Sequence, residues 1–319
     1  METFFQQTSV VLPVFFVMAL GYWAGHDKQF DSQGIKAFTD LVLSYALPLA
    51  LFVSIVKTKR DTFLSDASFF LPTLVAMTGL FLVLLIIFVY VWHKPKGEAA
   101  LQSALISTPG FAFFGFPIFD AMFGKPSEIS IALFGIVSAS TITPILIACL
   151  EFDSVRASGN QSQKTSRIIL MALRSTFAKP LIWVPLLGAF IVIMDIHVPN
   201  QIDAMFLLIG STTGGVALFL TGIIIATNRL KIDTEAALNV LGKLVLQPVI
   251  MGIAVVAFAI GEPLAQEGIL LAALASSALV SLIATKYQVY ENQCAATVLL
   301  TTLLLFATFP IAVLWSSGI

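Results

Sequence analysis

The sequence predicts an all-α polytopic membrane protein, because the chain is far too apolar for a soluble domain. Of its 319 residues, 58% are hydrophobic and 11% are charged, and the mean hydropathy is +0.96, whereas soluble domains carry about 25% charged residues. The net charge of -1 provides no basic surface for a polyanion. The predicted partners are therefore the lipid bilayer and a small solute, with no nucleic acid.

Ten apolar segments have roughly the 20 residues that a helix needs to cross a bilayer. They cover residues 4–24, 35–56, 69–92, 99–122, 129–150, 179–196, 202–226, 239–260, 266–285 and 292–315. The first segment lacks the basic start and the cleavage site of a signal peptide, so we expect it to be retained. The polar interval 151–178 is predicted to link a first five-helix repeat, 1–150, to a second repeat, 179–319.

Lysine and arginine are distributed unevenly between the predicted loops. The loops after the first, third, fifth, seventh and ninth segments hold thirteen of the 17 basic residues, and the opposite loops hold four. Basic residues are enriched in cytoplasmic loops. The sequence therefore predicts a multi-pass protein of the cytoplasmic (inner) membrane, with the linker inside and both termini outside.

Each half has an odd number of predicted helices, so an internal repeat would be inverted, as in many secondary transporters. Several residues recur after a nearly constant shift of 167 or 166 residues: Pro13 on Pro180, Gly21 on Gly188, 50–52 on 217–219, and Pro144 on Pro310. The third and eighth segments show no convincing match. We therefore predict inverted 5+5 repeats from three of the five helix pairs.

The fourth segment, 99–122, is predicted to be a broken helix. Pro109 removes an amide donor and clashes with the preceding turn, and Gly110 costs backbone entropy. Inside a membrane, unwound backbone is tolerated only where it is buried in protein or lines a cavity. The repeat places the equivalent point of the ninth segment at Ala275 or Ser276, so helices 4 and 9 are both predicted to be broken, opposite each other.

A broken helix exposes backbone amides, and amides at a helix N-terminus suit a carboxylate. The predicted substrate-binding residues around the two breaks are Thr108, Pro109, Gly110, Phe111, Ser276, Ser277 and Ser281. The hydroxyl groups and the amides of Gly110 and Phe111 are the expected donors. The alternative is that the hydroxyl groups bond within their own helices or join neighbouring helices.

Two further residues are candidates for the substrate site. Lys243 could attract anions, or its long stem could carry the ammonium to the cytoplasmic headgroups. Tyr45 could present its phenol to a cavity, or it could be an interfacial or core aromatic. Besides Lys243, the ionisable residues that we place well inside apolar segments are Asp40 and Asp120, and all three lie toward helix ends.

Enzyme chemistry is not expected. The three histidines lie in predicted loops or at segment ends, and no His/Cys/Asp cluster has metal-binding spacing. Cys149 and Cys294 fall in or beside apolar segments, where we expect packing roles. The sequence therefore predicts no catalytic residue, no metal and no cofactor.

Several motifs resemble the auxin efflux carrier family, which includes plant auxin exporters and bacterial permeases for malate, malonate and related acids. The motifs are Tyr45-Ala-Leu-Pro48, Ala50-Leu-Phe52, Gly115-Phe-Pro117, Lys179-Pro180 with Trp183, Pro185 and Gly188, Ala217-Leu-Phe219 with Thr221-Gly222, and Lys243-Leu244 with Pro248. The resemblance covers nearly the whole chain. It implies a scaffold of helices 1, 2, 6 and 7 that forms a homodimer, and a transport core of helices 3–5 and 8–10, with helices 4 and 9 crossing at the substrate site.

Two positions depart from the family pattern. Gly110 stands where many members have asparagine, and Ala275 stands where many have proline. The serines after Ala275 could still favour an unwound helix, because serine side chains compete for backbone partners.

The sequence therefore predicts a secondary transporter of small organic anions. The resemblance implies a dicarboxylate such as malate, malonate or oxalate and alternating access, whereas the helix breaks alone imply only an anion. Within six residues of Pro109 and Ser276 there is no Asp, Glu, Asn or Gln, so we expect sodium-independent, potential-sensitive transport without a buried coupling carboxylate. The alternatives are an anion channel and a membrane-embedded sensor or receptor without transport.

Overall fold

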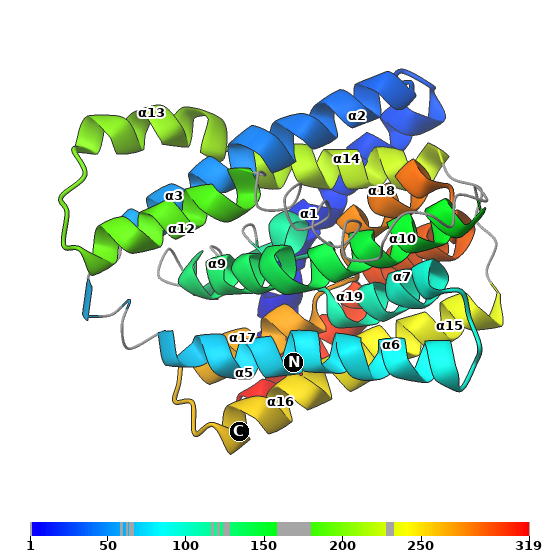
Figure 1. The fold of residues 1–319 in the computed structure, drawn as a ribbon. Coiled ribbons are helices and arrows are strands. Elements are labelled where there is room, and N and C mark those ends of the chain that lie inside the picture. The colour runs from blue at the N-terminus through cyan, green and yellow to red at the C-terminus, as the bar shows by residue number, and fades with distance from the viewer. Residues whose placement is uncertain are drawn as a thin grey trace.

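The computed structural model describes residues 2–57, 60–61, 63, 67–115, 118–119, 122–123, 128–157, 180–227 and 233–318. Over these residues the chain is helical, with one isolated backbone bridge and no strand (Figure 1). The predicted all-α class is therefore confirmed. Most of the predicted linker, and Asp120, lie outside the described residues.

In the first half of the chain, several helical stretches consist of two or three segments that follow one another directly. The elements of this half are α1 (Glu2–His26), α2 (Ser32–Leu41), η1 (Val42–Ala46), α3 (Leu47–Val56), η2 (Ala67–Phe69), α5 (Phe70–Leu74), η3 (Val75–Gly79), α6 (Leu80–Tyr90), α7 (Lys96–Ser107), η4 (Phe111–Gly115), α9 (Glu128–Val137), η6 (Ser138–Ile142) and α10 (Thr143–Ala157). Of the short η segments, η2 is a 3-10 turn and the others are π-helical turns.

The second half has a similar order of elements. They are α12 (Pro180–Ile193), α13 (Asn200–Gly210), α14 (Thr213–Thr227), α15 (Thr234–Leu241), η7 (Gly242–Leu246), α16 (Gln247–Ala257), α17 (Leu264–Ala273), α18 (Ala278–Tyr287) and α19 (Glu291–Ser316). The segment η7 is again a π-helical turn.

Three of the π-helical turns have a clear cause in the sequence, because each ends two residues before a proline. Pro48 follows η1, Pro144 follows η6 and Pro248 follows η7. Proline lacks the amide for the usual helical bond, and its ring clashes with the carbonyl four residues earlier. A wider turn moves that carbonyl away and lets the helix continue across the membrane.

Among the residues that the structure describes, six helical stretches are long and apolar enough to cross a membrane. They are Gln33–Val56, Phe70–Tyr90, Ile129–Ser154, Gln201–Thr227, Thr234–Ala257 and Glu291–Ser316. Three shorter apolar helices are Trp183–Ile193, Leu264–Ala273 and Ala278–Tyr287. The described part of the chain is therefore that of a polytopic membrane protein, although six rather than ten stretches have the full crossing length.

Helices from the two halves pack against each other in pairs, with one helix of each pair from each half. Helix α1 lies along α14, and α3 lies along α12 (Figure 1). Glycines allow the first of these contacts: a Cβ atom on Gly21 would lie 2.0 Å from the Phe219 carbonyl oxygen, and one on Gly222 would lie 2.0 Å from the Met18 carbonyl oxygen. Close backbone approach at small residues is the usual way in which helices associate in lipid.

The remaining helices form a second group with a densely packed interior. Helix α7 packs against α6 and α10, and α17 packs against α16 and α19. Large aromatic side chains are completely enclosed there: Phe69, Phe81, Phe111, Phe114, Phe119 and Phe134.

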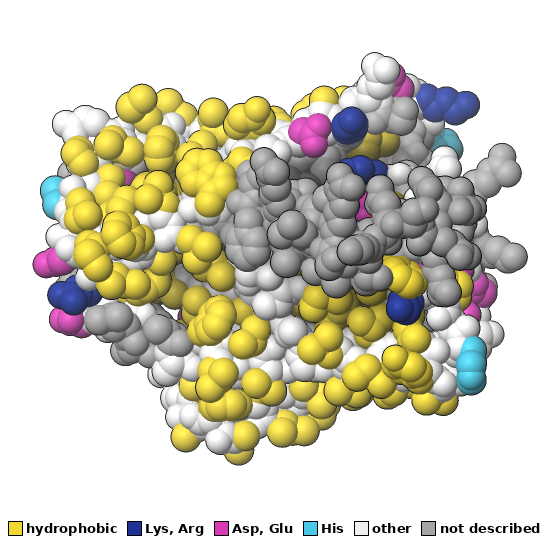
Figure 2. Space-filling model, viewed as in Figure 1, with side chains coloured by type: hydrophobic (Ala, Val, Ile, Leu, Met, Phe, Trp, Pro, Cys, Tyr) yellow, Lys and Arg dark blue, Asp and Glu magenta, His cyan; other side chains and the backbone are white. Residues whose placement is uncertain are grey.

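The surface matches a protein that is embedded in lipid. In the view of Figure 2, hydrophobic side chains cover much of the face over α12, α13 and α16, and most charged side chains lie toward the two ends of the molecule. Exposed aromatics include Trp23, Trp183 and Phe190. Such an apolar surface would be a liability in water but suits a hydrocarbon environment.

Candidate functional site: a crossing of two broken helices

The first break lies where Pro109 predicts it. Helix α7 ends at Ser107, and Thr108 is extended, with φ -113° and ψ 109°. The Thr108 amide still donates to the Ala104 carbonyl at 2.9 Å, so the helical ladder ends one residue before the proline. A π-helical turn, η4, follows from Phe111. The predicted interruption of helix 4 is therefore confirmed.

The second break forms without a proline. Helix α17 ends at Ala273, Leu274 is extended with φ -60° and ψ 159°, and α18 begins at Ala278 after an extended Ser277. The predicted interruption of helix 9 is confirmed, at the position that the 167-residue shift indicates. Instead of a proline, contacts with the first break satisfy the freed backbone groups.

The two extended segments cross as a short antiparallel pair. Pro109 bridges Ser276, the Gly110 amide donates to the Ala275 carbonyl at 2.8 Å, and the Ser277 amide donates to the Thr108 carbonyl at 3.1 Å. All six residues are buried. Because backbone groups in a membrane interior need partners, each break stabilises the other.

Gly110 is required by the packing at this crossing. A Cβ atom on Gly110 would lie 2.7 Å from the ring of Phe114 and 3.3 Å from the Ala275 carbonyl oxygen. The asparagine of many family members would not fit without movement of Phe114. The ring of Phe114, one turn later, thus occupies the space that a side chain at position 110 would need.

Two of the predicted donors are already occupied, which corrects the sequence-based expectation. The Gly110 amide is bonded to Ala275. Ser276 donates its hydroxyl to the Leu105 carbonyl at 2.7 Å, and its amide donates to the hydroxyl of Thr301 at 3.1 Å. For Ser276 the alternative, joining neighbouring helices, is therefore the right one.

Thr108 differs from these residues because its hydroxyl lacks a hydrogen-bond partner among the described residues. The side chain is only 3% exposed. Leaving a buried hydroxyl unpaired costs about 1–3 kcal/mol, so such a group calls for an explanation. Its neighbour Ser277 precedes the first turn of α18 and makes no side-chain capping bond there.

Phe111, Ser277 and Ser281 are also buried at or near the crossing. Ser281 lies one helical turn after Ser277, so the two serines share a face of α18. The ring of Phe111 packs beside Gly135, where an added Cβ atom would approach it to 3.2 Å. The structure thus places Thr108, Pro109, Gly110, Phe111, Ser276 and Ser277 at the crossing, with Ser281 one turn away.

Lys243 lies inside the protein, and the expectation that it reaches the headgroups is wrong. Its side chain is 0% exposed. The ammonium donates to the Ala272 carbonyl at 2.8 Å and to the amide oxygen of Gln247. Ala272 is in the last turn of α17, where the helix dipole places partial negative charge. The ammonium therefore stabilises the end of a half-helix next to the crossing.

Gln247 is a site residue that the sequence analysis missed. Its amide nitrogen donates to the carbonyl of Ser107, the last residue of α7, at 2.6 Å. Lys243 and Gln247 thus bind carbonyl groups at the ends of both interrupted half-helices. The available signal was the four-residue spacing, which puts Gln247 on the same helix face as Lys243.

This polar face continues toward the start of α15, where Glu235 and Asn239 keep the same spacing. Glu235 pairs with Lys94 at 2.7 Å and accepts a bond from the Tyr290 hydroxyl at 2.6 Å. Burial, followed by the bond to Glu235, raises the pKa of Tyr290, so the phenol stays protonated and acts as the donor.

Asn239 forms the next link of this polar face. Its amide oxygen accepts a bond from the Gln102 amide nitrogen of α7 at 2.8 Å. These contacts fix the rotation of α15 and η7 against α7, so Lys243 points at the crossing.

Comparisons with known proteins identify the family of the chain. The model of a family described as "Membrane transport protein" matches residues 7–314. The chain belongs to this family, the auxin efflux carrier family.

Relatives of the transporter have similar lengths. It is 29% identical over 303 residues to the "Uncharacterized transporter YfdV" of Escherichia coli (strain K12), covering 94% of this chain and 95% of that protein. It is 26% identical over 306 residues to the "Putative malonate transporter" of Rhizobium meliloti, covering 94% and 93%. A 23% identity to the "Lysosomal cholesterol signaling protein" of Mus musculus covers 75% of this chain but 29% of that protein.

The transporter does not bring all predicted residues to the crossing. Tyr45 lies in η1 and is 59% exposed, unlike the enclosed residues of the crossing. Asp40 is also exposed. Tyr45 therefore fits the alternative of an aromatic residue at the protein surface better than a substrate-binding role.

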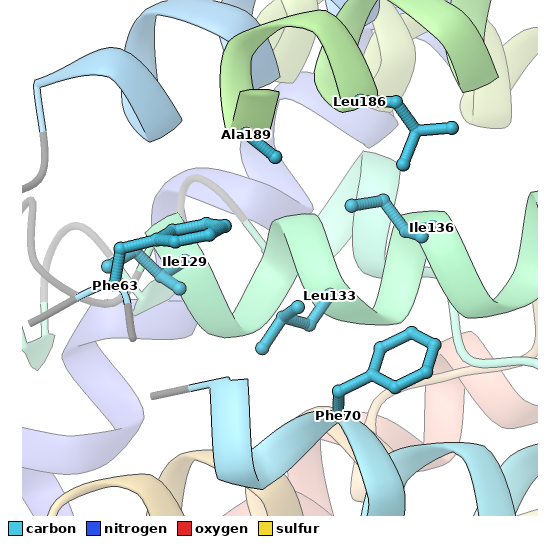
Figure 3. Close-up of a pocket in the computed structure, with 7 residues that line it drawn as sticks. All are labelled: Phe63, Phe70, Ile129, Leu133, Ile136, Leu186 and Ala189. Atoms are coloured by element: carbon cyan, nitrogen blue, oxygen red, sulfur yellow. The ribbon is translucent and has the colours of Figure 1, made fainter. Parts of the chain in front are cut away.

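A cavity of about 230 Å³ lies away from the crossing, between α5, α9 and α12 (Figure 3). Its lining is entirely apolar: Phe63, Phe70, Ile129, Leu133, Ile136, Leu186 and Ala189. It offers no donor to an anion, so we do not regard it as the substrate site.

Proposed function

We propose that this transporter is a secondary carrier of small organic anions, which bind at the crossing of the two broken helices. The observation that carries the proposal is the buried hydroxyl of Thr108, which has no hydrogen-bond partner among the described residues and lies beside the N-terminus of α18 (Ala278–Tyr287). Amides at the start of a helix carry partial positive charge, which favours a carboxylate. In α18 the Val280 amide donates to the Ser277 carbonyl at 3.1 Å, and the amides of Ala278 and Leu279 precede it.

The substrate class that we propose is a dicarboxylate such as malate, malonate or oxalate. Two carboxylates match two sets of donors: the Thr108 hydroxyl with the α18 amides on one side, and the buried ammonium of Lys243 on the other. The relative named as a putative malonate transporter supports this class.

We also propose that the chain consists of two inverted repeats of five membrane crossings. The bridged residues Pro109 and Ser276 are 167 positions apart, which is the shift found in the sequence. The same shift relates the two hydrogen bonds of the crossing. The donors, Gly110 and Ser277, are 167 positions apart, and so are the acceptors, Thr108 and Ala275. A pseudo-twofold axis through the crossing would account for this relation.

Two further observations support the same axis. The close contact of Gly21 with Phe219 has a counterpart, under the same shift, in that of Gly188 with Phe52. The π-helical turns η3 (Val75–Gly79) and η7 (Gly242–Leu246) are also 167 residues apart, in the helix pair for which the sequence showed no match.

The packing supports a division into scaffold and core. In the proposal, α1, α3, α12 and α14 belong to a scaffold of helices 1, 2, 6 and 7, and the elements around the crossing form the moving core. The exposed apolar faces of α1 and α12 are available for a homodimer in the cytoplasmic membrane. The basic loops would face the cytoplasm and both termini the outside.

The contacts of Lys243 support sodium-independent transport. In carriers with broken helices, carbonyls at half-helix ends commonly coordinate sodium. Here Lys243 and Gln247 occupy such carbonyls on Ala272 and Ser107. A fixed ammonium would take the place of a sodium ion at these carbonyls.

The expected potential dependence follows from the charge of the substrate. A negative interior opposes uptake by about 2.3 kcal/mol per negative charge per 100 mV, so a dianion accompanied by one proton faces half the penalty of a bare dianion. Uptake should therefore fall with a negative interior and rise as the external pH falls.

Substitution of Thr108 tests the binding site. Thr108→Val keeps the shape of the side chain and removes its hydroxyl, so the Kd for labelled malonate should rise about tenfold or more. Thr221→Val is the matched control, because Thr221 is fully buried in α14 and its hydroxyl bonds only to the Ala217 carbonyl of its own helix. Equal Kd values for wild type and Thr108→Val would remove Thr108 from the site.

A further inference from the structure

Glu267 is a buried ionisable residue that the proposed mechanism does not yet use. It lies in the first turn of α17, the half-helix that ends at the crossing, and its side chain is 3% exposed. It is the second residue of the predicted segment 266–285, so it was not among the ionisable residues placed well inside apolar segments. Carboxylates at membrane depth are costly and mark proton relays or substrate paths in transporters.

Ser130 of α9 holds this carboxylate. The Ser130 hydroxyl, which is 0% exposed, donates to an oxygen of Glu267. On the neighbouring side of α17 the packing is tight: a Cβ atom on the adjacent Gly268 would lie 2.6 Å from the ring of Phe69 and 2.7 Å from Met251. A buried carboxyl group beside a hydroxyl can be held either as the neutral acid or as the hydrogen-bonded carboxylate.

Few other titratable groups belong to the elements packed against α17. Among the described residues, α9 carries Glu128, η7 carries Lys243, and α19 carries Glu291 and Cys294 in its first turn, whereas α16 carries none. Glu291 and Cys294 lie at the N-terminal end of α19. This end is near the start of α15, because the Tyr290 hydroxyl donates to Glu235 there.

We propose that the Glu267–Ser130 pair binds the proton that accompanies the organic anion through the membrane. This inference rests on the proposed function and adds a site for the accompanying proton. A proton from external water adds to a carboxylate oxygen of Glu267, the neutral acid moves with the core and the bound anion, and the proton returns to water on the cytoplasmic side. No other bond changes.

The position of the pair suits this role. Glu267 precedes the extended Leu274 by seven residues, which is about 10 Å of helix. Under the proposed topology the start of α17 faces outward, so the carboxylate lies between the external solution and the crossing. Both α9 and α17 belong to the proposed core, so proton and anion would move together.

Monomethyl malonate separates this inference from the proposed function. It keeps one charge over the physiological pH range, because its second carboxyl group is esterified and carries no proton of its own. If the proton travels only on the substrate, uptake of this ester into proteoliposomes should be independent of pH. Proton binding at Glu267 instead predicts uptake that rises as external pH falls, with proton influx that a trapped pH-sensitive dye records.

Glu267→Gln should abolish both the pH dependence and the proton influx, because an amide keeps the hydrogen bond but does not titrate in this range. Asp195→Asn is the matched control: Asp195 is an exposed carboxylate between α12 and α13, and asparagine tolerates its positive φ. This control should keep the pH dependence. Ester uptake by wild type that is independent of pH would overturn the inference and leave the proposed function intact.

Ser130→Ala decides the question if Glu267→Gln is inactive. The substitution keeps the carboxylate and removes a donor to its charged form, so half-maximal uptake should shift to higher pH. An unchanged pH midpoint in Ser130→Ala would overturn the inference, as would an active Glu267→Gln variant that still carries protons.

Discussion

At the scale of single residues, the site depends on polar side chains whose partners come from distant parts of the sequence. Lys243 contacts Ala272, and Gln247 contacts Ser107. A lysine in a predicted membrane helix is usually expected to extend toward the headgroups. Here carbonyl groups at half-helix ends provide buried acceptors, so the shorter path for the ammonium is inward.

Loss of the Lys243 charge should weaken anion transport. Lys243→Gln retains a donor for the Ala272 carbonyl but removes the positive charge, which acts strongly in a buried, low-dielectric site. We expect the KM for labelled malonate uptake to rise about tenfold or more. Lys286→Gln is the control, because Lys286 is exposed in the last turn of α18.

Kinetics of the two lysine variants in proteoliposomes check this expectation. A KM for Lys243→Gln equal to that of Lys286→Gln and of wild type would show that the buried ammonium serves only the packing of α17 and η7.

At this scale the sequence identified the right region but not the right donors. Pro109 and Gly110 revealed the first break, because their effect on a helix is local. The bond of the Gly110 amide to Ala275 joins residues far apart in the chain, so local reasoning left that amide free. For the same reason Gln247 and Glu267 were missed, since burial depends on tertiary packing.

At the scale of helices, the second break shows how structure forms without a local signal. Residues 272–280 contain no proline or glycine, yet the helix stops at Ala273. The backbone groups freed at Pro109 need partners in a membrane interior, and the extended residues from Leu274 supply them. The 167-residue shift predicted the position correctly because it compares two halves instead of local propensities.

The contact of α1 with α14 gives a second prediction at this scale. A Cβ atom on Gly222 would lie 2.0 Å from the Met18 carbonyl oxygen, so Gly222→Ala should force the helices apart and cost about 1–3 kcal/mol. Gly215→Ala is the control on the same helix, where an added Cβ atom meets nothing within 4 Å. It should be neutral or stabilising by about 0.5–1 kcal/mol.

Thermal unfolding of the purified protein in detergent measures the difference between the two glycine variants. We expect a lower Tm for Gly222→Ala and an unchanged or higher Tm for Gly215→Ala. A Tm for Gly222→Ala that matches wild type would contradict the close approach of the two backbones.

At the scale of the whole molecule, composition was enough to predict a polytopic helical protein. Apolar residues are so frequent that the membrane class follows without any motif. The number of crossings is less direct, because six stretches have the full length and others are interrupted or short. Interrupted helices place polar backbone at the centre of the molecule, which is the feature that makes an anion site feasible in a lipid environment.

The central claim is that the chain carries an organic anion by alternating access, without sodium, and counterflow tests it most directly. Purified protein is reconstituted in sodium-free vesicles that contain unlabelled malonate, and labelled malonate is added outside. We predict that the trapped acid accelerates uptake and transiently concentrates the label inside, and that Thr108→Val weakens this effect while Thr221→Val does not. Simple equilibration of the label, as through a channel, or a strict requirement for sodium would contradict the account.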